Sequence, residues 1–80
     1  MSDIAARVSQ CFLTVFPDLT PAELPRASQA ALAQWDSLAH VTLLSTIAEE
    51  FDVELDDGSF ETLTSYALVL DFVESQLAGR

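Results

Sequence analysis

Residues 35–51 read WDSLAHVTLLSTIAEEF. From Ser37 onward, apolar residues recur at the three- and four-residue spacing of one helix face, so we predict a helix over Ser37–Phe51. The arc of this face is wide, and a helix with so broad a face needs more than one neighbour. Its members are Leu38, Val41, Leu43, Leu44, Ser45, Ile47, Ala48 and Phe51. We therefore expect a central helix packed between two others.

The start of this helix carries the most informative polar residue of the chain. Ser37 directly follows Asp36, whose side chain can cap the helix. The first N–H groups of a helix have no internal partner, and the helix dipole favours negative charge beside them. A phosphate esterified to Ser37 would therefore be held well. The alternative is that Ser37 is an N-cap residue without further role, which is common for serine.

Three further helices follow from the same spacing rules. Residues 4–16 form an apolar stripe that Pro17 ends, because the residue before a proline is pushed out of the helical region. Residues 52–59 are expected to form a turn, with Gly58 as a helix breaker, and a short helix is expected over residues 60–63. Thr64 or Ser65 would cap the last helix, residues 66–77, with its stripe at Tyr66, Leu70, Val73 and Leu77. The predicted fold is an all-α bundle of four helices: three main helices and one short helix, which is the third in chain order.

A long first loop joins the first two main helices. It spans residues 17–35, and Thr20 to Glu23 has the capping pattern of a short helical turn, with proline at its first position. We expect the loop's large apolar side chains, including the anchor Trp35, to pin it to the bundle. They are Leu19, Leu24, Leu32 and Trp35.

Size and charge restrict the function further. Eighty residues, half of them hydrophobic, suit one domain over residues 1–80, too small for a deep catalytic cleft. Thirteen acids against three arginines give a net charge of −10, which disfavours nucleic acid and anionic membranes and favours basic enzyme surfaces as partners. The apolar runs are far shorter than the ~20 residues of a membrane span, and no signal-peptide pattern precedes them. We expect a cytoplasmic monomer without membrane insertion.

Catalysis and metal binding find little support in the residues. Asp36, Ser37 and His40 are the residue types of a hydrolase triad, but adjacent helix positions do not face one another and no oxyanion hole is recognisable. An EF-hand calcium loop centred on Gly58 would place Val53 and Leu55 at ligand positions, so we predict no metal site. His40 is expected to be a partly packed structural residue, and Cys11 a buried structural thiol. We predict that the chain is not an enzyme.

The residues around Ser37 also resemble a known family. Asp36-Ser37-Leu38 and the pattern that follows resemble the second helix and next loop of an acyl carrier protein. That pattern is Val41, Leu43, Leu44, Ile47, Glu49-Glu50-Phe51, Val53 and Leu55. The resemblance implies that a phosphopantetheinyl transferase attaches 4'-phosphopantetheine from coenzyme A to Ser37, with Asp36 helping to present the serine. It also implies that the arm carries acyl groups as thioesters. Acyl-loading and acyl-processing enzymes would then contact a face containing Leu38, Val41, Thr42 and Glu49.

The chain departs from the carriers of general fatty acid synthesis in two ways. Ala39 and Thr42 stand where those carriers have acids, and Trp35 replaces a small residue. Trp-Asp-Ser-Leu-x-His instead resembles freestanding carriers of dedicated or secondary-metabolic pathways, of polyketide or fatty-acid type. The alternatives are an aminoacyl or peptidyl carrier of the same fold and an unmodified acidic helical interaction module. In a carrier of this size, weak packing would let the helices separate and admit an apolar acyl chain.

Overall fold

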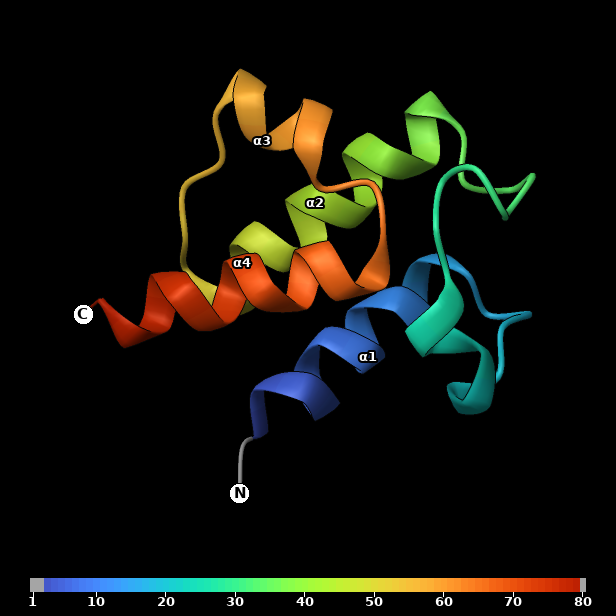
Figure 1. Cartoon of the computed structure of the whole chain (residues 1–80), viewed down its shortest axis with the longest axis horizontal. Coiled ribbons are helices and arrows are strands. Elements are labelled where there is room, and N and C mark those ends of the chain that lie inside the picture. Colours follow the sequence, from blue (N-terminus) through green and yellow to red (C-terminus); the bar gives the residue numbers. More distant parts are fainter. Residues whose placement is uncertain (1–2, 80) are drawn as a thin grey trace.

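The helices lie close to where the apolar spacing predicted them. In this computed structural model, which describes residues 3–79, the chain is helical apart from its loops, and no strand longer than one isolated bridge occurs in that range. The elements are α1 (Asp3–Val15), the short 3₁₀-helix η1 (Pro21–Arg26), α2 (Ser37–Phe51), α3 (Asp57–Thr62) and α4 (Tyr66–Ala78). Figure 1 shows α3 beside α2 and the long loop that leads from α1 to α2. The predicted all-α bundle is confirmed.

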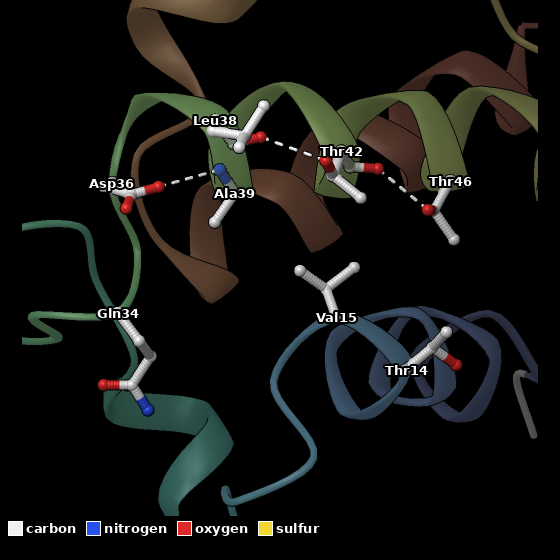
Figure 2. Close-up of a pocket in the computed structure, with 8 residues that line it drawn as sticks. All are labelled: Thr14, Val15, Gln34, Asp36, Leu38, Ala39, Thr42 and Thr46. Carbon is white, nitrogen blue, oxygen red and sulfur yellow. Dashed lines mark hydrogen bonds between the residues drawn. The ribbon is translucent and has the colours of Figure 1, made fainter.

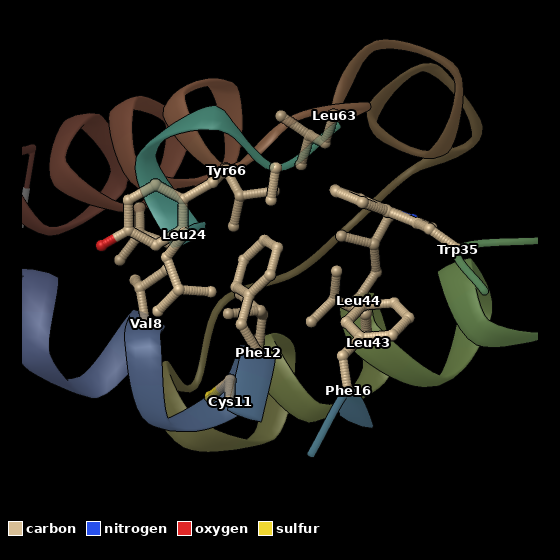
Figure 3. Close-up of a cluster of buried hydrophobic side chains, with 14 of the residues drawn as sticks. Val8, Cys11, Phe12, Phe16, Leu24, Trp35, Leu43, Leu44, Leu63 and Tyr66 are labelled. Carbon is tan, nitrogen blue, oxygen red and sulfur yellow. The ribbon is translucent and has the colours of Figure 1, made fainter. Parts of the chain in front are cut away.

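The core is built around Phe12 of α1, which is fully buried. Its ring centroid lies 5.5 Å from that of Trp35 and 5.1 Å from that of Tyr66, both in edge-to-face geometry (Figure 3). Edge-to-face pairs place the positive ring edge on the negative ring face, which favours a defined arrangement beyond simple burial. One ring of α1 therefore joins the loop before α2 to the start of α4.

The wide apolar arc expected for α2 divides into two. Its buried side is the narrower stripe His40, Leu43, Leu44, Ile47 and Phe51. Leu38 is 77% exposed and Val41 49% exposed, and Ser45 is exposed as well. The buried face of α2 is therefore narrower than the predicted arc, because the neighbours of α2 cover only one stripe of its surface. α2 does contact two helices, α1 and α3, while α1 contacts both α2 and α4.

α3 begins three residues earlier than predicted. Asp56 caps it, since the Ser59 N–H donates to the Asp56 carboxylate at 2.8 Å and the Ser59 hydroxyl at 3.1 Å. These hydrogen bonds from Ser59 hold the pKa of Asp56 below its ordinary value. Gly58, which was expected to precede the helix as a helix breaker, lies inside it. A good cap thus outweighed the low helix propensity of one glycine.

The long first loop is held by backbone pairing as well as by side chains. The Gln29 N–H donates to the Thr64 carbonyl at 2.8 Å, and the Tyr66 N–H donates to the Ala27 carbonyl at 3.0 Å. The predicted helical turn is present as η1, where the Thr20 N–H and hydroxyl both donate to the Glu23 carboxylate. Of the four predicted anchors Leu19, Leu24 and Trp35 are buried, whereas Leu32 is only half-buried.

Two smaller expectations also have outcomes. In α4, Tyr66 and Val73 of the predicted stripe are buried, whereas Leu70 and Leu77 are only half-buried and Val69 is fully buried instead. Cys11 is buried, as expected, and burial raises the pKa of its thiol to about 11, with a further contribution from the nearby Glu50 carboxylate. Over residues 3–79, no helix has both the length and the apolar character that crossing a bilayer requires.

Candidate functional site

Ser37 is the first residue of α2 and its side chain is exposed. The helix begins there because Asp36 has extended backbone geometry and caps it. The Ala39 N–H donates to the Asp36 carboxylate at 2.9 Å, and the His40 N–H donates to the Asp36 carbonyl at 2.8 Å. The cap is therefore Asp36, and Ser37 is free of that role. The hydroxyl of Ser37 stands at the positive end of a helix of 15 residues.

Beneath this exposed serine lies a buried hydrogen-bonded chain. The Trp35 Nε1–H donates to His40 Nδ1 at 2.9 Å, and His40 Nε2 lies 2.6 Å from the Phe60 carbonyl oxygen. Since Nδ1 accepts from tryptophan, the proton of a neutral imidazole sits on Nε2 and is donated to Phe60. His40 thus joins the first loop, α2 and α3, and it is more buried than the partly packed residue expected, at 6% exposed.

This arrangement argues against the hydrolase interpretation of Asp36, Ser37 and His40. Both ring nitrogens of His40 have partners other than Ser37, so the imidazole is not placed to take a proton from the serine. Nor does any group of three or more His, Cys, Asp or Glu side chains within residues 3–79 suit a metal ion. The Ser37 hydroxyl is thus an accessible group without a built-in activating base.

The four residues predicted to contact partners are all on the surface. Leu38, Val41, Thr42 and Glu49 are exposed. Leu38, Thr42 and Glu49 follow the four- and seven-residue spacing of one helix face, but Glu49 lies about 16 Å along the axis from Leu38. From Ser37 to Ala48 the helix carries no Asp, Glu, Lys or Arg. The exposed surface of α2 beyond Ser37 is therefore uncharged up to Ala48, and the acids of α2 lie at its far end.

A groove opens beside this surface, between α2, the end of α1 and the loop before α2 (Figure 2). Its volume is about 450 Å³. Its lining residues are Thr14, Val15, Gln34, Asp36, Leu38, Ala39, Thr42 and Thr46. The sequence pattern had singled out the members from the start of α2 but not Thr14, Val15 or Gln34. Val15 belongs to the predicted apolar stripe of residues 4–16, but nothing local in the sequence places any of the three beside α2, because tertiary packing alone brings them there.

The comparisons with known proteins agree with this geometry. A curated acyl carrier protein from Thermosynechococcus vestitus is 40% identical to the chain over 56 residues, which cover 70% of this chain and 69% of the relative. No family model matches the chain, and no solved structure matches it significantly.

Proposed function

The chain belongs to the acyl carrier protein family, and on this premise we propose that it carries acyl groups as thioesters on a 4'-phosphopantetheine arm attached to Ser37. The observation that supports the attachment site best is the exposure of Ser37 at the first position of α2. A visiting enzyme can reach this hydroxyl without unfolding any part of the bundle. The phosphate of the arm would then lie near the first N–H groups of α2, where negative charge is favoured.

Attachment requires little chemistry from the chain itself. The Ser37 oxygen would form a bond to the phosphorus of coenzyme A that bears pantetheine, and the bond from that phosphorus to the adenosine 3',5'-bisphosphate would break. The serine proton would pass to a base of the phosphopantetheinyl transferase, because His40 is held by Trp35 and Phe60. The attached group supplies a thiol for thioester formation. The bundle contributes a rigid, accessible anchor.

Asp36 has two roles in this proposal. Its carboxylate caps α2 through the Ala39 N–H, which fixes the backbone direction at Ser37. It also lies beside the serine in an exposed position, where it is accessible to the transferase. Leu38, Val41, Thr42 and Glu49 would form the surrounding contact face for the transferase and for the acyl-loading and acyl-processing enzymes.

Charge supports basic partner surfaces. Ten acids but no Lys or Arg fall between Arg26 and Arg80, and Arg7 is already paired with Glu50 at 2.7 Å. Long-range attraction would bring a basic enzyme to the acidic end of α2 and to the loop behind it, while short-range fit at Leu38 would select it. The lack of charge over the first turns of α2 supports a dedicated or secondary-metabolic pathway, since a partner that requires acids at Ala39 and Thr42 would not find them.

Mass spectrometry tests the proposal directly. The protein is incubated with coenzyme A and a broad-specificity phosphopantetheinyl transferase, alongside Ser37→Ala and the control Ser45→Ala, which alters an exposed serine of the same helix. We expect one arm to be added to the unaltered protein and to Ser45→Ala, and none to Ser37→Ala. No addition to the unaltered protein would favour an unmodified interaction module. An addition that persists in Ser37→Ala would move the site elsewhere.

A further inference from the structure

The groove beside α2 is more apolar than its residue names suggest. Three of its lining residues are threonines, and each donates its hydroxyl to a carbonyl one turn earlier in its own helix. The bonds are Thr14 to Gln10 at 2.9 Å, Thr42 to Leu38 at 3.0 Å and Thr46 to Thr42 at 2.8 Å. Since the O–H donors of these threonines are occupied within their helices, the threonines offer a ligand their methyl groups and no free donor, beside Val15 and Ala39.

The opposite side of α2 is closely packed. Trp35 is 1% exposed and Leu43 and Leu44 are fully buried. The His40 ring lies between Trp35 and Phe60, with ring centroids 5.9 Å and 6.2 Å away and a hydrogen bond on each side. An acyl chain that entered here would have to displace close-packed side chains and break the His40 bonds.

We infer that the groove between α1 and α2 is the resting place of the acyl-loaded arm, held there by apolar contact with Val15, Ala39, Thr42 and Thr46. This inference rests on the proposed attachment at Ser37. It replaces the expectation that the helices separate to admit the acyl chain into the core. The cargo class is an apolar acyl group, because the groove wall presents the methyl groups of Val15, Ala39, Thr42 and Thr46, and its one charged lining residue, Asp36, lies at the start of α2.

The dimensions allow this placement. Ser37 does not line the groove, but its neighbours Asp36 and Leu38 do, so the arm must cross the first turn of α2 before it enters. Thr46 lies about 14 Å further along the axis. The arm has about 14 bonds from the serine oxygen to the sulfur, equivalent to nearly five residues of extended chain or about 16 Å. The thioester can therefore reach the groove. Figure 2 shows Gln34 and Asp36 at the end of the groove nearest the start of α2, where the polar part of the arm would lie.

An NMR comparison tests the placement. The protein is loaded once with coenzyme A and once with octanoyl coenzyme A, and mass spectrometry verifies both products. We expect the octanoyl group to shift the backbone amide signals of Val15, Ala39, Thr42 and Thr46. Shifts at the core residues Leu44, Ile47 and Val69 instead would place the cargo inside the bundle, and shifts confined to residues 36–38 would leave it in solvent. Either result overturns the inference while leaving attachment at Ser37 intact, whereas failure of loading would overturn the proposed function itself.

Variants of two exposed residues of α2 provide a second, independent readout. Thr42→Glu puts a carboxylate into the groove, and Ser45→Glu adds the same charge to the same helix outside it. We expect alkaline hydrolysis of the octanoyl thioester to be several-fold faster in Thr42→Glu than in Ser45→Glu or the unaltered protein. Thr42→Val keeps the methyl surface and should retain full protection. Equal hydrolysis rates in Thr42→Glu and Ser45→Glu would contradict the inference.

Discussion

The two ends of α2 are held in different ways. At its start, the anchoring is buried: Trp35 and His40 hold the helix from below, and the surface beside Ser37 stays open. At its end, the anchoring is on the surface: the Arg7 guanidinium donates to the Glu50 carboxylate and to the Glu50 carbonyl, each at 2.7 Å, and lies 4.5 Å from the centroid of the Phe51 ring. The difference shows how a small bundle keeps one helix end accessible: apart from the Asp36 cap, the bonds that fix that end lie beneath it.

The largest expected effect follows from removing the buried anchor. Trp35→Ala deletes a side chain that is 1% exposed, and large-to-small changes of this kind cost about 3–5 kcal/mol. In a domain whose whole stability is about 5–15 kcal/mol, we expect a large drop in melting temperature or loss of the fold. Circular dichroism melting measures it.

Trp35→Phe separates the volume of this anchor from its hydrogen bond. It keeps an aromatic ring but leaves His40 Nδ1 without its donor, so we expect a smaller loss of about 1–3 kcal/mol. If Trp35→Phe were as stable as the unaltered protein, the bond to His40 would contribute nothing to holding the start of α2.

A cap substitution is expected to have the next largest effect. Asp36→Ala removes the acceptor of the Ala39 N–H and should lower stability by about 0.5–2 kcal/mol. By our proposal it should also slow modification of Ser37, measured as the rate of mass gain. Ser65→Ala is the matched control, because it removes the equivalent cap of α4, which accepts from the Leu68 N–H. An equal modification rate in the two variants would restrict Asp36 to its structural role.

The surface anchor at the other end of α2 should matter less. Arg7→Met keeps an apolar stem but loses the ion pair and the contact with Phe51. Both partners of the pair are nearly half exposed, so the pair itself contributes about 0.2–1 kcal/mol. We expect a small loss of stability by urea unfolding and an unchanged rate of Ser37 modification. A loss as large as that of Trp35→Ala would reverse the contrast between the two ends.

Added salt should stabilise the protein mildly, in contrast to the destabilising substitutions above. The net charge of −10 makes the acids repel one another, and added salt screens this repulsion. Although salt also weakens the exposed pair of Arg7 and Glu50, we expect repulsion to dominate and the melting temperature to rise with sodium chloride or divalent cations. A melting temperature that does not respond to either would contradict the charge argument.

The smallest expected effect is an acid-dependent loosening of α3. Hydrogen bonds from Ser59 lower the pKa of Asp56 in the folded chain, so its contribution is present above the pKa of the unfolded chain and is lost as the pH falls through the lower folded value. We expect the amides of α3 to lose protection from exchange at acid pH, whereas the start of α4, which the neutral hydroxyl of Ser65 caps, should show no such loss. In Asp56→Asn this difference in pH response should disappear.

The features that the sequence determined by itself depend on residues close together in the chain. The apolar spacing predicted α2 to the residue and α1 nearly so, and the Asp36-Ser37 pair was recognisable because caps and helix starts depend on neighbours a few positions apart. The predicted start of α3 was three residues too late, because Gly58 was interpreted as the end of a turn. The cap at Asp56 that allows the helix to begin earlier is established only by its hydrogen bonds in the folded chain.

The tertiary structure decided which side of α2 is covered and what lies beside Ser37. Leu38 and Val41 have the same apolar character as Leu43 and Leu44, and only the positions of α1 and α3 separate the exposed pair from the buried pair. The groove and the bond from Trp35 to His40 likewise depend on where the long loop and the end of α1 pack. Helix periodicity records which residues share a face, whereas burial depends on contacts between segments far apart in the chain.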